Sequence, residues 1–249
     1  MEKQIALRKS IRHYNSDALT EAAQTALASW RNWAKQYTDS ADADCDMRLL
    51  PGDAPLKGLY IIKAPGYMVF LGRPTRIGRI NAGFVLEQIS LKLTELGVGT
   101  CYLGATHMDE LKADAKGLEP LIFMSLGMPD QTLTRKNISE FKRKRTDEIA
   151  TGEIQGDMAR VIESARIAPS AMNRQPWRIV VTGNRAICCV EHSVLDSFKR
   201  LSEIDMGIVM SHMLLTARTM SENAHIECAP QDADKAPRGS EYIATVVIS

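Results

Sequence analysis

The sequence lacks any apolar run as long as the roughly 20 residues that a membrane-spanning helix needs. Residues 1–10 also lack the apolar stretch of a secretory signal peptide. These two absences predict a cytoplasmic protein that makes no use of a membrane.

Cysteine is scarce, and its spacing is not that of a metal or redox site. The five cysteines include no C-x-x-C motif, and the adjacent Cys188 and Cys189 lie in an apolar stretch. The five histidines show no metal-ligand spacing either. We therefore expect core thiols in a reducing compartment, with neither a disulfide framework nor a metal site.

An excess of charge of either sign is also missing. Lys and Arg number 31 against 30 Asp and Glu, a net charge of +1, which argues against nucleic acid as the main partner. The 45% hydrophobic and 24% charged residues are typical of a soluble globular protein. No Asp, Glu or His stands out as an acid–base catalyst, so no catalytic side chain is predicted.

Apolar periodicity and short apolar runs alternate along the chain, which predicts one α+β domain over residues 1–249. Helices are predicted at 2–9, 19–36, 77–96, 158–167 and 204–220. Strands are predicted at 67–71, 121–125, 177–182, 186–191 and 242–248. Gly183-Asn184 is expected to form a hairpin turn, and 97–104 a glycine-rich turn.

An internal repeat appears when the chain is shifted by 124 residues. Asn81-Ala-Gly-Phe-Val85 then falls on Asp205-Met-Gly-Ile-Val209, and 121–125 falls on 245–249. One offset that aligns a helix and a strand favours duplication, with half-repeats of about 1–145 and 146–249. Chance similarity between two apolar helices is the alternative.

The two halves differ in their polar segments. The first half carries the basic stretch Arg8–Arg12 and a second basic pair, Arg135-Lys136, whereas the second half ends without such a tail. Conversely, only the second half carries the polar loop Pro169–Trp177, and the matching region near Trp30–Trp33 is predicted to be plain helix. Each half has what the other lacks, which predicts one composite site.

The loop Pro169-Ser-Ala-Met-Asn-Arg-Gln-Pro-Trp177 is the most informative part of the sequence. Two prolines stiffen it, and it presents one hydroxyl and two amides within six positions. Amides match both donors and acceptors, so the loop suits a planar ligand edged with heteroatoms. The alternative is a structural turn before a strand.

Four motifs together resemble the FMN-dependent nitroreductases: Arg8–Tyr14, Gly97–Gly104, Gly127-Met-Pro129 followed by Arg135-Lys136, and Pro169–Trp177. Within that family, the sequence resembles an internally duplicated, single-chain type. The resemblance implies a nitroreductase-like α/β/α sandwich in which two fused halves form a pseudo-dimer. Such a chain can complete its site as a monomer, and further dimerisation stays open.

The resemblance also implies which residues bind FMN. The phosphate group is expected to be bound by Arg8, Ser10, Arg12, Arg135 and Lys136. Backbone groups of Leu103 and Gly104 are expected beside flavin N5 and O4. The ring and ribityl chain are expected to contact Pro169, Ser170 and Asn173, with Gln175 and Trp177 supporting the loop. The rest of the basic run 135–145 is expected to be a solvated connector.

The implied activity is hydride transfer from NADH or NADPH through flavin N5 to a nitroaromatic, a quinone or a similar small acceptor, in a ping-pong reaction. A second hypothesis is a flavin-binding carrier or sensor without significant turnover. A third is a flavin-free protein that keeps the fold.

Overall fold

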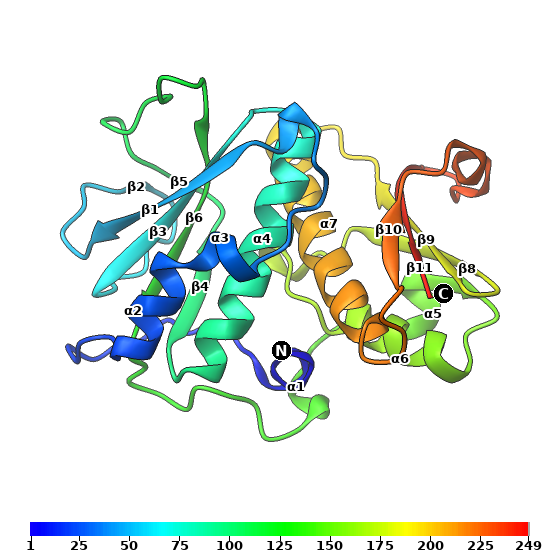
Figure 1. The fold of residues 1–249 in the computed structure, drawn as a ribbon, viewed down its shortest axis with the longest axis horizontal. Coiled ribbons are helices and arrows are strands. Elements are labelled where there is room, and N and C mark those ends of the chain that lie inside the picture. Colours follow the sequence, from blue (N-terminus) through cyan, green and yellow to red (C-terminus); the bar gives the residue numbers. More distant parts are fainter. Residues whose placement is uncertain (249) are drawn as a thin grey trace.

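Two β-sheets lie on either side of a central pair of long helices in the computed structural model, which describes residues 1–248 (Figure 1). The helices are α1 Glu2–Leu7, α2 Glu21–Ala28, α3 Trp30–Trp33, α4 Arg76–Glu95, α5 Thr146–Ile149, α6 Gly156–Arg166 and α7 Asp196–Ala217. The strands are β1 Cys45–Pro51, β2 Lys57–Gly58, β3 Gly66–Gly72, β4 Gly99–Leu103, β5 Thr106–His107, β6 Glu119–Gly127, β7 Ala150–Gly152, β8 Trp177–Thr182, β9 Arg185–Glu191, β10 His225–Glu227 and β11 Ser240–Val247. In this part of the chain, no helix is both long enough and apolar enough to cross a bilayer.

The fold is α+β, and the five predicted strands fall within or overlap β3, β6, β8, β9 and β11. The prediction of one helix over 19–36 is wrong, because α2 ends at Ala28 and α3 covers only Trp30–Trp33. Between them, the Ser29 hydroxyl donates to the Thr25 carbonyl at 2.7 Å. Residues 97–104 are also mostly strand rather than turn. Cys101 in β4 pairs with Ser125 in β6. This short run forms a strand because it is hydrogen-bonded to β6, a partner that the local sequence does not indicate.

The two sheets have the same internal order. The first runs β1-β3-β6-β4, and the second runs β8-β9-β11-β10 with β7 added beside β8. In each half a helix precedes two antiparallel strands, a long helix follows, and two more strands close the sheet. The halves therefore share one topology, apart from the extra strand β7 and the small β2–β5 ribbon.

The layers differ from the expected α/β/α sandwich, because the helices α4 and α7 form the middle layer and the sheets form the outer layers (Figure 1). Both helices are buried around almost their whole circumference after the first turns. A helix with buried side chains on all its faces needs neighbours on every side. For each helix these are the other helix and its own sheet, with α4 against β3, β4 and β6 and α7 against β8, β9 and β11.

The two central helices touch backbone to backbone at a pair of glycines. A Cβ atom on Gly83 would lie 1.9 Å from the Ile204 carbonyl oxygen, and a Cβ atom on Gly207 would lie 1.9 Å from the Ile80 carbonyl oxygen. Gly83 and Gly207 are 124 positions apart, and so are Ile80 and Ile204, so the two contacts are made by matching residues. The contact is thus reciprocal, and any side chain larger than a hydrogen atom would force the helices apart.

The polar loop of the second half also has a structural counterpart in the first. Residues 34–44 connect α3 to β1 as residues 167–176 connect α6 to β8. Asn81 Oδ1 accepts from the Tyr37 backbone N–H at 3.0 Å, and Asp205 Oδ1 accepts from the Ala171 backbone N–H at the same distance. The expectation that the counterpart is the Trp30–Trp33 helix is therefore wrong, because the matching segment is the loop that follows it.

Candidate functional site

The two basic segments of the first half lie side by side. The Arg135 backbone N–H donates to the Leu7 carbonyl at 2.8 Å, and the Arg135 guanidinium donates to the Arg8 carbonyl. Arg135 also stacks on Phe141, with 3.8 Å between its guanidinium carbon and the ring centroid. Arg143 lies over the same ring at 5.5 Å. Phe141 thus holds two guanidinium groups close to Arg8.

Arg143 connects this basic cluster to the polar loop of the second half. Its Nη1 donates to Asn173 Oδ1 at 2.6 Å, and its Nε donates to the Ala168 carbonyl at 3.0 Å. Asn173 in turn donates to the Lys142 carbonyl at 2.7 Å. The structure therefore brings together three predicted residues, Arg8, Arg135 and Asn173, although they are far apart in the sequence.

Arg143 is the residue that sequence reasoning missed, because the basic run was interpreted as a solvated connector. That interpretation is wrong for Arg143, which is partly buried, and for Phe141, which is buried. The available signal was Phe141, a large apolar residue two positions before Arg143 in an otherwise polar run. A buried aromatic ring beside a guanidinium favours stacking over solvation.

The cluster is electrostatically unbalanced. Burial and the neighbouring Arg8 charge lower the pKa of Arg135, and burial together with Arg135 and Arg8 lowers the pKa of Arg143. Arg8 is 4% exposed, and its Nη2 is buried without a hydrogen-bond partner in the part of the chain that the structure describes. Buried guanidinium groups with an unused donor form charge-assisted bonds with an anion. The site therefore fits a phosphate-like group.

A buried polar network fixes one side of Arg8. Its Nε donates to Ser90 Oγ at 2.9 Å and lies 3.6 Å from Glu87 Oε1. Glu87 also accepts from the Tyr102 hydroxyl at 2.9 Å and lies 2.9 Å from His212 Nε2. Burial alone would raise the pKa of Glu87, but Arg8, His212 and Tyr102 together hold it below its usual range. Glu87 is thus an anion that orients both Arg8 and Tyr102.

Tyr102 is followed in the sequence by Leu103 and Gly104, the predicted backbone donors at the end of β4. Leu103 is buried and Gly104 is exposed, and a Cβ atom on Gly104 would lie 3.0 Å from the Leu201 side chain of α7. One helical turn later, Asp205 binds the Ala171 N–H. The end of β4 and the polar loop therefore both contact the first half of α7.

The loop itself is held in a demanding conformation. Met172, Asn173 and Gln175 have φ angles of 51°, 57° and 51°, a region that favours glycine. Ser170 Oγ accepts from the Gln175 N–H at 2.9 Å, and Gln175 Oε1 accepts from the Lys144 N–H at 2.7 Å. Strain of this kind persists where surrounding contacts impose it, and it is common at ligand sites. Gln175 and Trp177 are both buried at the end of the loop.

The other predicted residues are less closely tied to the cluster. Ser10 and Pro169 are half-buried, whereas Arg12 and Lys136 are exposed. Across residues 1–248, no hydrogen bond or ion pair connects the side chains of Arg12 or Lys136 to the cluster. Within the same range, no group of three His, Cys, Asp or Glu side chains is arranged to hold a metal ion.

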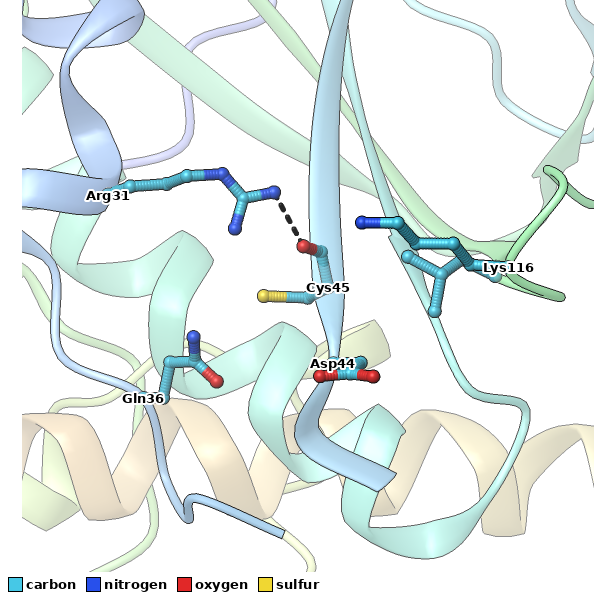
Figure 2. Close-up of a pocket in the computed structure, with 6 residues that line it drawn as sticks. Arg31, Gln36, Asp44, Cys45 and Lys116 are labelled. Carbon is cyan, nitrogen blue, oxygen red and sulfur yellow. Dashed lines mark hydrogen bonds between the residues drawn. The ribbon is translucent and has the colours of Figure 1, made fainter. Parts of the chain in front are cut away.

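A cavity of about 330 Å³ lies elsewhere, in the first half, and Figure 2 shows its polar lining. Arg31 Nη2 donates to the Cys45 carbonyl at 2.6 Å at this cavity, so that guanidinium is already bound. Burial raises the pKa of the Cys45 thiol to about 11, which keeps it protonated and unreactive. None of the predicted cofactor-binding residues lines this cavity.

Comparison with known proteins decides the family. A family model described as "Putative TM nitroreductase" matches residues 1–217. The chain belongs to this nitroreductase family. A search of curated proteins gave no match.

Among solved structures that match the chain, one shares its fold over almost the whole length, and two others are matched over little more than half of this chain. A "putative nitroreductase" from Thermotoga maritima is 22% identical, with a TM-score of 0.67 over 99% of this chain and 93% of that one. A "putative nitroreductase in complex with fmn" from Desulfovibrio desulfuricans is 18% identical, with a TM-score of 0.40 over 55% of this chain and 92% of that one. A "Nitroreductase with Bound FMN" from Bacteroides fragilis is 12% identical, with a TM-score of 0.42 over 59% and 95%.

Proposed function

We propose that this nitroreductase-family protein is an FMN-dependent oxidoreductase that uses NADH or NADPH to reduce a nitroaromatic, a quinone or a similar small acceptor. The observation that carries the proposal is the convergence of Arg8, Arg135 and Arg143 on the polar loop through Asn173. The three cations come from the first half, and the loop comes from the second.

The phosphate group of FMN fits the arginine cluster. The unpartnered Nη2 of Arg8 supplies a buried donor, and the partly buried Arg135 and Arg143 supply two more cations. Each charge-assisted bond contributes roughly 1.5–3 kcal/mol. Ser10 stays a proposed neutral contact, and the exposed Arg12 and Lys136 are proposed to contact the phosphate from the rim of the site.

The flavin ring is proposed to lie between the end of β4 and the polar loop. Leu103 and Gly104 would present their backbone N–H groups, while Pro169, Ser170 and Asn173 would bind the ring edge and ribityl chain. Bound FMN would supply a redox centre that accepts and donates hydride at N5. The chain's own residues bind and orient that group, and a ping-pong sequence follows from one site serving both substrates in turn.

We further propose that the chain is a duplicated pseudo-dimer, a single domain with half-repeats of about 1–145 and 146–249. Three observations at the same offset of 124 residues support this. They are the shared sequence segment, the reciprocal glycine contact of α4 with α7, and the paired loop anchors Asn81 and Asp205. The common topology of the two sheets agrees with them.

A single flavin per chain follows from the asymmetry of the halves. The position of Gly104 is matched by Cys228 in the second half, where the Tyr37 hydroxyl lies 3.8 Å from the Cys228 sulfur. Tyr37 also packs its ring against Phe84, so side chains fill the region that a second flavin would need. The five free cysteines fit the proposed location in the reducing cytoplasm.

An absorption spectrum of the purified protein, recorded before and after anaerobic addition of NADH or NADPH, tests the proposal. Flavin bands that bleach on addition support an FMN-dependent reductase. Flavin bands that persist favour the alternative, a carrier or sensor without significant turnover. No flavin, and none taken up from added FMN, contradicts the proposal and favours a flavin-free protein.

A further inference from the structure

Asp205 lies between the two backbone segments that are proposed to bind the flavin ring. It is on α7 and is 4% exposed, and its Oδ1 accepts from the Ala171 N–H at 3.0 Å. One turn earlier on the same helix, Leu201 contacts Gly104. The carboxyl group is therefore next to the reacting part of the site without belonging to the arginine cluster.

Over the described residues 1–248, no Lys, Arg or His nitrogen forms an ion pair with Asp205. Two titratable or charged groups face it, Arg174 from the polar loop and Tyr102 from β4. Arg174 stacks on Phe198, with 4.4 Å between its guanidinium carbon and the ring centroid. Its charge thus influences Asp205 only from a distance.

Burial without a paired cation favours the neutral form of the Asp205 carboxyl group. Burial raises the pKa of Asp205 to about 7, although the Ala171 N–H and the Arg174 charge both act to lower it. A group with a pKa near the working pH is the most effective general acid, because it holds a proton and still releases it readily.

The first half of the chain provides an internal comparison. At the matching position, Asn81 anchors its own loop through Tyr37 and also donates to the Ala43 carbonyl at 2.8 Å. An amide is therefore sufficient to hold the loop. A carboxyl group at position 205 adds one capacity that the amide lacks, which is exchange of a proton.

We propose that Asp205 is the proton donor of the site, supplying the proton that reduction of a quinone consumes in addition to hydride. The inference rests on the proposed function. A quinone that becomes a quinol takes up two electrons and two protons, and hydride carries both electrons and one proton. The O–H bond of Asp205 breaks, an O–H bond forms on the quinone oxygen, and solvent returns a proton to the carboxylate.

The test is to separate the half-reactions in wild type and in Asp205→Asn, which installs the residue used at position 81. After anaerobic reduction, each protein is mixed with a benzoquinone or with ferricyanide, an oxidant that takes up electrons without protons. We expect quinone reduction to slow by roughly 100-fold or more in the variant and to lose its pH dependence near 7. Reduction by NAD(P)H and oxidation by ferricyanide should keep wild-type rates.

Equal quinone rates and pH profiles in the two proteins would overturn the inference, provided that both bind FMN equally. Asn81→Asp is the matched control, because it places a carboxyl group on the side that Tyr37 fills, and it should leave the quinone rate unchanged. A fall in the quinone rate of that control as large as in Asp205→Asn would also contradict a specific role for Asp205.

The infrared spectrum of the flavin-free protein gives a readout that does not depend on turnover. A protonated carboxyl band at pH 6 that is missing in Asp205→Asn supports the inference, and its absence in wild type overturns it. Failure of wild type to bind FMN would instead contradict the proposed function, while the infrared result would still report whether Asp205 holds a proton.

Discussion

At the residue scale, two arginines of the same basic run have opposite surroundings. Arg143 is partly buried between Phe141 and Asn173, whereas Arg145 is exposed and paired with Asp147 at 2.9 Å. Exposed ion pairs contribute little to binding or stability. A desolvated guanidinium beside a phosphate contributes much more.

We therefore expect Arg143→Ala to weaken FMN binding by about 10- to 100-fold, the loss of one charge-assisted bond of roughly 1.5–3 kcal/mol. Fluorescence titration of the flavin-free protein with FMN measures this. Arg145→Ala is the matched control and should bind as wild type does. Equal losses in both variants would indicate a general charge effect instead of a defined phosphate contact.

Asp205 makes the stability of the fold depend on pH. Its pKa is about 7 in the folded protein against an ordinary value of 3.8 for an aspartate, so the folded state binds more protons than the unfolded state between these pH values. The free energy of unfolding should therefore fall as pH rises from about 4 to about 7, by on the order of 4 kcal/mol. Urea unfolding of wild type and Asp205→Asn at pH 5 and pH 8 measures it, and an equal pH dependence in both would contradict the assignment.

At the scale of elements, the crossing of α4 and α7 depends on Gly83 and Gly207. Helix propensity alone would make Gly83→Ala stabilising by about 1 kcal/mol. The added Cβ atom would instead meet the Ile204 carbonyl oxygen at 1.9 Å, so we expect destabilisation of roughly 1–3 kcal/mol or more. Thermal or urea unfolding measures it, and Gly207→Ala should behave alike. A stabilised variant would contradict the close contact.

Helices and strands with strong patterns could be predicted from the sequence, and those that depend on distant partners could not. The hairpin at Gly183-Asn184 and the long helix α4 follow from local signals and are confirmed. β4 was missed, because its five residues become a strand only by pairing with β6. α7 begins at Asp196, before the predicted 204, because its first turns are mostly exposed and lack an apolar pattern.

The candidate site likewise has residues that local motifs indicate and residues that only the fold brings into place. The Pro169–Trp177 loop and the Arg8 segment of the proposed site could be predicted, because each is a dense local motif. Arg143 and Asp205 could not be found from motifs, because their importance comes from what lies beside them in space. Of the two, Asp205 had a signal in the repeat, where it falls on Asn81 within an apolar helix.

At the scale of the whole molecule, the two proposed halves are packed against each other through α4 and α7, backbone to backbone at Gly83 and Gly207. All residues of the proposed site come from one chain, so the proposed site has no need of a second copy. We expect a monomer that binds one FMN per chain. Light scattering coupled to size-exclusion chromatography measures the mass, and titration calorimetry measures the stoichiometry. Two FMN per chain would contradict the filling of the second region by Tyr37.

Position 81 and position 205 show what the proposed joining of two halves in one chain would make available. In a symmetric homodimer every residue occurs twice, so a side chain chosen for one site is imposed on the other. Here an amide anchors one loop and a carboxyl group anchors its counterpart, each at 3.0 Å. In the proposed arrangement, the loop anchored by Asn81 can stay closed by side chains while the loop anchored by Asp205 binds a ligand. Two identical subunits cannot differ in this way.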